Sequence, residues 1–510
     1  MQPASLARLT IAVLAIIAIA SSLMQLRALS DGLRVTHEHV GSIPVTVFRQ
    51  ASGESAPVVV IAHGFAGSQQ LMQPFAITLA RNGYVAVTFD FPGHGRNPNP
   101  MTGGLADADA MQRDLLGTLD QVTRYAQGLS TEQDGLAVLG HSMAADIVVR
   151  YAHAHPFVQA TVAVSLFLPK PEEFQPHNLL IIDGALEAGA LKDQAKQIIA
   201  ASIGHEPDAD VTYGSFADGS ARRLTFARDV EHIGVLYSGD SMGASLAWLN
   251  QIFKRHGSGF LDIRGGSLGL LFLGLVALAW PLAGLLPRIA LPPLEPVLGW
   301  RGLLPLALAP ALLTPLILWR LPTAFLPILL GDYLSLHFLL YGALTAGGFW
   351  LVRKRLVQAN AIQVAPWKFA LAAIAVCAYS LLALGLPLNA YVVSFIPGLW
   401  RLPLVAAVMA GTLPYFVADE WLTRRLSPLR GAYAATKFCF LLSLVIAVAL
   451  NLEKLFFLVI IIPAILLLFA IFGLFSAWIN RRTGQPLLAA LSNALFFAWF
   501  IAGTFPVVSR

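Results

Sequence analysis

The sequence predicts an α/β domain with a mostly parallel sheet and helices on both faces, followed by an all-α domain with several transmembrane helices. Of the 510 residues, 56% are hydrophobic and only 12% are charged, which is more apolar than a soluble protein surface allows. From about residue 35 to 256, β-rich runs alternate with helical patterns, and from Gly265 onward long apolar segments recur. The expected domains are therefore residues 1–34, 35–258 and 259–510.

The first expected element is an uncharged apolar segment at residues 9–26, LTIAVLAIIAIASSLMQL. It is long enough to cross a hydrocarbon core of about 30 Å. Arg8 is the only basic residue before it, and the run is longer than the core of a typical signal peptide. We expect an uncleaved transmembrane anchor, with a cleaved signal peptide as the alternative.

The expected strands of the α/β domain are near-continuous runs of Val, Ile, Leu and Ala separated by helical patterns. Such strands are buried on both faces, and right-handed crossovers place the helices there. The runs are VTVFR, PVVVIAHG, VAVTFDF, LAVLGHS, ATVAVSL, NLLIIDG and RRLTFARD.

The C-terminal region is expected to hold about eight transmembrane helices. The apolar segments lie at about 266–286, 302–319, 329–352, 369–388, 402–421, 435–452, 455–478 and 487–507. Two further apolar stretches, residues 325–330 and 390–400, are too short to span a bilayer and are expected to be interfacial or re-entrant.

Basic residues between these segments predict the orientation, because cytoplasmic loops are enriched in Lys and Arg. They gather at residues 353–355 with Lys368, at Arg424, Arg425, Arg430 and Lys437, and at Arg481 and Arg482. The pattern predicts a multi-pass protein of the cytoplasmic membrane whose α/β domain is extracytoplasmic. Lys254, Arg255 and Arg264 would then lie on the outer side, contrary to the rule. The basic residues form no dense tract with interleaved aromatics, so we expect membrane lipid and no nucleic acid as a partner.

Five short motifs lie at or just after the ends of predicted strands of the α/β domain. They are AHGFAGS at 62–68, DFPGHG at 90–95, GHSMA at 140–144, LLIIDGALEAG at 179–189 and RDVEHIG at 228–234. In this order they resemble the α/β-hydrolase family, in its dienelactone-hydrolase-like and esterase/lipase branch, over about residues 40–255. The resemblance implies a serine hydrolase, and we expect neither a cofactor nor a metal.

Ser142 is the expected nucleophile, on a sharp turn between a strand and a helix. Gly140 and Ala144 are the small neighbours that this strained turn requires, although the family more often has Gly at the second position. By resemblance, the oxyanion hole is formed by the backbone amides of Phe65 and Met143.

The resemblance also implies an acid and a base in chain order after the serine. Glu187 occupies the usual position of the acid, four residues beyond a strand, and Asp183 is the alternative. His232 is the expected base rather than His205, because it follows the last predicted strand. Three other histidines, His63, His94 and His141, are interpreted as residues that shape their own loops.

Other features of the sequence give weaker signals. His37 and His39 form a His-x-His pair without a visible third metal ligand, and Cys377 and Cys439 lie in apolar runs that suggest neither a disulfide nor a metal site. Asp332 and His337 are ionisable residues in or near an apolar span, where charge is costly and a functional role is a hypothesis.

We therefore expect a membrane-bound serine hydrolase that cleaves an ester or thioester of a small molecule or lipid through an acyl-enzyme. The stretch 169–177 is too short for a lid, so the membrane domain or the bilayer surface is expected to cover the site. The alternatives are an acyltransferase, and a transporter or membrane scaffold whose hydrolase-like domain only binds a ligand.

Overall fold

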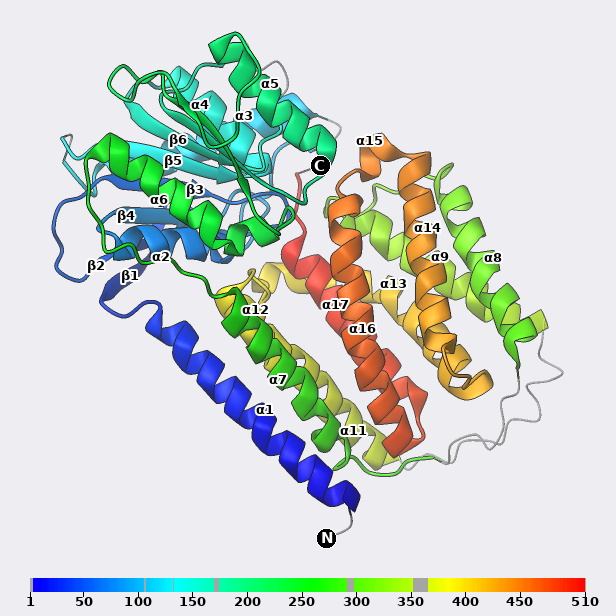
Figure 1. Ribbon diagram of the computed structural model, residues 1–510. Coiled ribbons are helices and arrows are strands. Elements are labelled where there is room, and N and C mark those ends of the chain that lie inside the picture. The colour runs from blue at the N-terminus through cyan, green and yellow to red at the C-terminus, as the bar shows by residue number, and fades with distance from the viewer. Residues whose placement is uncertain are drawn as a thin grey trace. The chain divides into compact units, whose positions relative to one another are not determined.

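The computed structural model of the protein describes residues 3–104, 107–131, 133–168, 174–290, 298–351 and 366–509 (Figure 1). The chain folds into two compact units. Unit 1 comprises residues 1–20, 270–387 and 395–503, and unit 2 comprises residues 21–269, 388–394 and 504–510. Unit 2 therefore includes the segment expected to form the α/β domain, together with two short pieces of the C-terminal region.

A nine-stranded sheet forms the centre of unit 2, in the order β1-β2-β4-β3-β5-β6-β7-β9-β8. The strands are β1 (Leu33–Val40), β2 (Ile43–Gln50), β3 (Val58–Ala62), β4 (Val85–Phe89), β5 (Leu136–His141), β6 (Val158–Val164), β7 (Leu179–Gly184), β8 (Thr212–Tyr213) and β9 (Arg222–Ala227). In sheet order, the six central strands β4, β3, β5, β6, β7 and β9 are parallel to their neighbours, and β1, β2 and β8 pair antiparallel at the edges. The predicted mostly parallel sheet is confirmed.

Strand β1 was not among the predicted strands, and it contains His37 and His39. It pairs with β2 as an antiparallel hairpin at the sheet edge, with Val40 opposite Ile43. An edge strand buries little apolar surface, so its sequence lacks the Val/Ile/Leu run that marks the central strands.

Helices pack against both faces of the sheet (Figure 1). Their bounds are α2 (Gln73–Arg81), α3 (Ala108–Gln127), α4 (Met143–Ala154), α5 (Gly189–Ile203) and α6 (Gly239–Phe253). Alternate residues of β7 serve the two faces: Leu180 and Ile182 join the core beneath α2 and α6, whereas Leu179 and Ile181 join the core beneath α4 and α5. This period of two is the reason a doubly covered strand is apolar throughout.

The remaining long helices are apolar. They are α1 (Pro3–Ala28), α7 (Gly265–Ala283), α8 (Trp300–Leu318), α9 (Gly331–Leu351), α11 (Pro366–Ala378), α12 (Gly385–Tyr391), α13 (Leu402–Trp421), α14 (Ala432–Leu450), α16 (Leu458–Thr483) and α17 (Pro486–Thr504), with the short α15 at Leu452–Leu455. A π-helical segment, Tyr379–Leu384, joins α11 to α12. Within the described residues, nine helical stretches are long and apolar enough to cross a membrane, and they match the predicted segments to within a few residues. The predicted basic loop at 353–355 lies outside the described residues.

Close backbone packing joins α9 to α13 in unit 1. A Cβ atom added at Gly342 would lie 2.5 Å from the Cα of Tyr415, and one added at Gly411 would lie 2.3 Å from the carbonyl oxygen of Ser335. Small residues at such positions let two membrane helices approach closely, where dispersion contacts replace the hydrophobic effect.

Candidate active site

Ser142 lies on a strained turn between β5 and α4. Its backbone has φ 55° and ψ −119°, a combination that L-residues rarely adopt and that costs on the order of 1–3 kcal/mol. The turn is tight, since a Cβ atom added at Gly140 would lie 2.4 Å from the carbonyl oxygen of Ala144. The predicted need for small neighbours therefore has a direct steric cause, and the methyl group of Ala144 itself fits in a fully buried position.

Three predicted side chains meet at the carboxyl ends of the parallel strands. Nε2 of His232 lies 2.9 Å from Oγ of Ser142, and Nδ1 of His232 lies 3.1 Å from Oε2 of Glu187. An ionised Glu187 can only accept, so Nδ1 of a neutral His232 carries the proton and Nε2 is left to accept one from the serine hydroxyl. The ring is thereby held in the tautomer that suits a base.

Glu187 is buried and receives two further hydrogen bonds. Oγ of Ser165 donates to Oε1 over 2.5 Å, and the Gly184 amide donates to the same oxygen over 3.0 Å. Burial acts to raise the pKa of Glu187, but the hydrogen bond and positive charge of His232, with the bonds from Ser165 and Gly184, bring it below its ordinary value. The carboxylate is therefore ionised at neutral pH. The sequence analysis missed Ser165, because only the paired ends of β6 and β7 bring it to Glu187.

The alternative acid, Asp183, is one residue before the end of β7 and is fully buried. Burial raises the pKa of Asp183 to about 8, with a further contribution from the charge of Glu187. Of the two carboxyl groups, Glu187 is the one that bonds His232. His205, the alternative base, is exposed, and its Nδ1 bonds the carbonyl oxygen of the neighbouring Glu206.

The turn at residues 63–67 lies against Ser142. A Cβ atom added at Gly64 would lie 3.0 Å from Cβ of Ser142, so only glycine fits without a shift. Nδ1 of His63 donates to the carbonyl oxygen of Gly64 over 2.8 Å, and its Nε2 accepts the amide of Phe91 over 3.1 Å. These two bonds hold His63 in one neutral tautomer, and burial lowers its pKa. Phe65 follows directly, as the resemblance requires.

The other two histidines also bond locally. Nδ1 of His94 donates to the carbonyl oxygen of Pro92 over 2.9 Å. Nε2 of His141 donates to the backbone carbonyl of His232 over 3.0 Å, and burial, followed by the charge of His232, holds the pKa of His141 well below its usual range. His141 thus supports the loop that carries His232.

Three large apolar side chains near these residues are exposed. Phe167 lies two residues after Ser165, Leu186 precedes Glu187, and Ile233 follows His232; their exposed fractions are 61%, 65% and 38%. We call Phe167, Leu186 and Ile233 the apolar rim. Each of the three is one or two residues away in sequence from Ser165, Glu187 or His232, so they are the candidates for contact with an apolar ligand at this site.

In the part of the chain that the structure describes, no three His, Cys, Asp or Glu side chains lie where they could share a metal ion. In the His-x-His pair, Nδ1 of His37 bonds Oγ1 of Thr46 at 2.9 Å. Glu38, between the two histidines, accepts a hydrogen bond of 2.5 Å from Tyr125.

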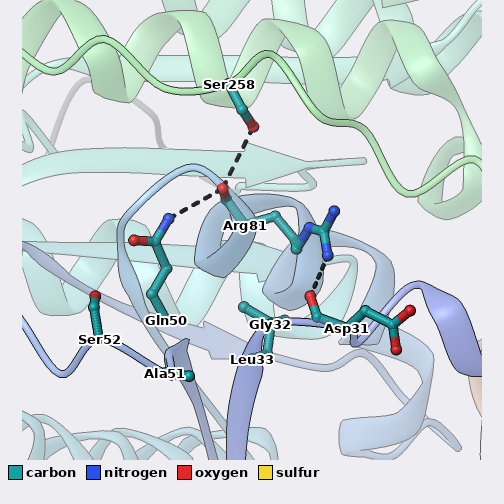
Figure 2. Close-up of a pocket in the computed structure, with 8 residues that line it drawn as sticks. All are labelled: Asp31, Gly32, Leu33, Gln50, Ala51, Ser52, Arg81 and Ser258. Carbon is teal, nitrogen blue, oxygen red and sulfur yellow. Dashed lines mark hydrogen bonds between the residues drawn. The ribbon is translucent and has the colours of Figure 1, made fainter.

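A cavity of about 350 Å³ lies at the opposite edge of the sheet (Figure 2). Arg81, which lines this cavity, lies between the end of α2 and the start of β4, so the cavity is at the amino ends of the parallel strands. Its guanidinium donates to the carbonyl of Asp31, and its own carbonyl accepts from Gln50 and Ser258. Since Ser142 lies at the carboxyl ends, this cavity does not belong to the candidate active site.

Unit 1 contains buried ionisable side chains. His337 is fully buried, with Nδ1 3.4 Å from the hydroxyl of Tyr333, and Asp332 is nearly so. Lys437, predicted to mark a loop, is instead buried in an ion pair with Asp419. The neighbouring Glu420 accepts 2.6 Å and 3.3 Å hydrogen bonds from Ser476 and Asn493. Internal partners of this kind offset the cost of polar groups in an apolar region.

Comparison with known proteins supports the fold. Residues 53–187 match the family model Hydrolase_4, described as serine aminopeptidase, S33. Two uncharacterized proteins of Mycobacterium tuberculosis, from strains H37Rv and CDC 1551, are each 32% identical over 111 residues, which is 21% of this chain. The chain spans about a third of the length of these relatives, 36% in each case.

Among solved structures, a predicted CIB-like hydrolase from Thermoplasma acidophilum is 13% identical and covers 43% of this chain and 100% of its own, with a TM-score of 0.34. The thioesterase domain of the curacin biosynthetic pathway is 14% identical and covers 44% of this chain and 100% of its own, with a TM-score of 0.31. The family match, taken with the order and direction of the strands, identifies an α/β-hydrolase domain, carried in one chain with a C-terminal region of long apolar helices.

Proposed function

We propose that the protein is a membrane-bound serine hydrolase that cleaves an ester or thioester through an acyl-enzyme formed on Ser142. The observation that supports it best is the hydrogen-bonded series from Glu187 through His232 to Ser142, on a strained turn between a strand and a helix. A domain that only binds a ligand gains nothing from a strained serine in this series.

In the proposed reaction, Nε2 of His232 takes the proton from the hydroxyl of Ser142 as Oγ attacks the substrate carbonyl. Glu187 stabilises the imidazolium that forms and keeps its ring in place. The protonated ring then gives its proton to the leaving alcohol or thiol. Water repeats the sequence, losing a proton to His232 as it attacks the acyl-enzyme, and Ser142 is released with the carboxylic acid product.

The tetrahedral intermediate needs two N–H donors, and we assign these to the amides of Phe65 and Met143. Met143 is the first residue of α4, where amides have no partner within the helix and the helix dipole favours negative charge. Phe65 follows Gly64, which packs against Ser142. Loss of one such donor typically lowers kcat by about 10² to 10³.

The apolar rim favours a substrate whose acyl group is apolar. Its three members are exposed, and each lies one or two residues from Ser165, Glu187 or His232 in the sequence. An acyl chain laid against them would remove apolar surface from water, worth about 25 cal/mol per Å². Nine apolar helical stretches in the described part of the chain are consistent with such a substrate coming from a membrane.

We further propose that unit 2 faces the extracytoplasmic side of the cytoplasmic membrane. Arg424, Arg425, Arg481 and Arg482 lie at or near the ends of α13 and α16, and the positive-inside rule would place those ends in the cytoplasm. Counting helices back from there gives an outer start for α7, which directly follows the hydrolase domain in sequence.

A fluorophosphonate probe tests the proposal on isolated membranes that contain the full chain. We expect labelling of the wild type, none of the Ser142→Ala variant, and labelling at the wild-type rate of Ser130→Ala, which removes a half-buried hydroxyl elsewhere in unit 2. If the wild type and Ser142→Ala label equally, or neither labels, the proposed acyl-enzyme on Ser142 is refuted. Transfer to an acceptor other than water would appear as product formation that depends on an added alcohol.

A further inference from the structure

The hydrolase unit is completed by two segments that come from far along the chain. Residues 388–394 and 504–510 belong to unit 2, although transmembrane-type helices of unit 1 precede each of them in sequence. The second segment is the red end of the chain, marked C in Figure 1. Residues 390–394, part of the apolar stretch at 390–400 that the sequence predicts to be interfacial or re-entrant, thus belong to unit 2.

The C-terminal segment pairs with the loop that follows β4. The Val507 amide donates to the carbonyl oxygen of Gly93 over 2.9 Å, and the carbonyl of Val507 accepts the amide of Met101 over 2.8 Å. The Ser509 amide then donates to the carbonyl of Met101 over 2.9 Å. Gly93 has φ +74°, and a Cβ atom there would lie 2.3 Å from the carbonyl oxygen of Val507. The loop therefore has glycine where the segment approaches.

This loop contacts the turn that carries Phe65. His94, the residue after Gly93, has its ring centroid 5.1 Å from that of His63 and 6.2 Å from that of Phe65. At the start of the loop, the Phe91 amide donates to Nε2 of His63 over 3.1 Å. A displaced loop would thus disturb the His63 hydrogen bonds and the ring packing that hold Phe65.

The other segment contacts the same turn from its far end. The Ser394 amide donates to Oγ of Ser68 over 2.8 Å, and Ser68 is fully buried. Nearby, Nε2 of Gln73 donates to the carbonyl oxygen of Ala390 over 3.3 Å. Ser68 directly follows the turn at residues 64–67, which is closed by a 3.1 Å hydrogen bond from the Gly67 amide to the carbonyl oxygen of Gly64. Gly64 in turn packs against Ser142. Residues 388–394 therefore contact the 63–68 turn directly, whereas residues 504–510 contact the loop after β4 that packs against this turn.

We infer that residues 388–394 and 504–510 are positioning segments that hold the Phe65 amide where the oxyanion forms. The inference rests on the proposed function, because Phe65 matters in this way only if Ser142 forms a tetrahedral intermediate. An oxyanion donor contributes through its exact placement in a preorganised site, so loss of either segment's hydrogen bond should affect turnover more than substrate binding.

Two proline variants of the full chain remove one backbone donor each. Ser394→Pro deletes the N–H that bonds Ser68, and Val507→Pro deletes the N–H that bonds Gly93. The matched controls, Ser394→Ala and Val507→Ala, keep both amides. The Ser394 hydroxyl has no hydrogen-bond partner among the described residues, which makes its removal a mild change.

The first measurement is kcat and KM on p-nitrophenyl butyrate in detergent. We expect kcat of each proline variant to fall by about tenfold or more, with KM within about twofold of its alanine control. The reason is that one oxyanion donor raises kcat by about 10² to 10³, and a misplaced donor loses part of that factor. Melting temperatures of the hydrolase unit identify any variant that has merely unfolded. Proline variants that are folded and match their alanine controls in kcat would overturn the inference.

The second measurement is independent of catalysis. Hydrogen exchange of a peptide covering residues 63–68 should speed up in both proline variants relative to the controls, while a peptide covering β5 keeps its protection. If the wild type hydrolyses no ester but the exchange responds, the proposed function fails and the structural coupling stands. If the wild type is active and neither kcat nor exchange responds, the positioning role is refuted.

Discussion

Ser165 donates a 2.5 Å hydrogen bond to Oε1 of Glu187, the oxygen that does not face His232. Ser165 follows β6 at φ 54°, so the chain adopts an unfavourable backbone conformation at this position. This second hydrogen bond fixes the carboxylate from behind and lowers its pKa. The position of the imidazole therefore depends on a residue from a neighbouring strand.

Removal of this bond should reduce activity. Ser165→Ala leaves Oε1 with the Gly184 amide alone, and a buried hydrogen bond to a charged group is worth about 1.5–3 kcal/mol. We expect kcat to fall by about tenfold or more on a soluble ester. The control is Ser241→Ala, which removes a buried hydroxyl without a described partner elsewhere in unit 2. Equal kcat values for the two variants would contradict a role for Ser165.

The two carboxyl groups after β7 should respond oppositely to amide substitution. Glu187→Gln presents an amide to His232, can favour the wrong tautomer, and should lower kcat by about 10³ to 10⁴, as in other enzymes with this arrangement. The kcat of Asp183→Asn should stay within about threefold of the wild-type value. A carboxyl group with a pKa of about 8 is mostly protonated at pH 7 and in that form resembles an amide. Initial rates at pH 7 test both, and a large loss in Asp183→Asn alone would reverse the assignment.

Asp183 should also make the stability of the hydrolase unit depend on pH. Its pKa is about 8 in the folded protein and about 3.9 in an unfolded chain. Between these values the folded state keeps a proton that the unfolded chain has released, so the free energy of unfolding falls as pH rises. In Asp183→Asn that loss is absent, so its melting temperature relative to the wild type should increase steadily from pH 5 to about 8. A constant difference across this range would refute the raised pKa.

Replacing glycine by alanine should have opposite effects on stability in the strained turn and in the middle of a helix. Gly140→Ala places a Cβ atom 2.4 Å from the carbonyl oxygen of Ala144, so it should destabilise the domain and abolish labelling of Ser142. Gly117, in the middle of α3, has open space around an added Cβ. Gly117→Ala should therefore raise stability by about 0.5–1 kcal/mol. Thermal unfolding of both variants and probe labelling test this, and a neutral Gly140→Ala would show that the turn can relax.

The apolar rim should govern preference for acyl length. Leu186→Asn and Ile233→Asn remove apolar surface beside the site, so kcat/KM for a dodecanoyl ester should fall several-fold while that for an acetyl ester changes little. The control is Val211→Asn, an exposed apolar residue outside the rim. A uniform loss on both esters would indicate damage to the site rather than altered specificity.

The sequence by itself determined the local elements, because their signals are local. Central strands such as β5 and β7 are continuous apolar runs, the transmembrane-type helices are long enough to span a bilayer, and Gly140 and Ala144 flank Ser142 at fixed spacing. Motif order then predicted that Ser142, Glu187 and His232 would meet at one edge of the sheet. That edge is shared because the strands are parallel.

Only the tertiary structure decided which groups support those residues. Ser165 reaches Glu187 because β6 and β7 pair in one register, and Asp183 has a raised pKa because the packed core removes it from water. Residues 388–394 and 504–510 contact the 63–68 turn or the loop beside it from hundreds of residues away. In these contacts the distant segments take part through their backbone N–H and C=O groups. Almost any residue supplies these groups, proline alone lacking the N–H, so the sequence carries no pattern for them.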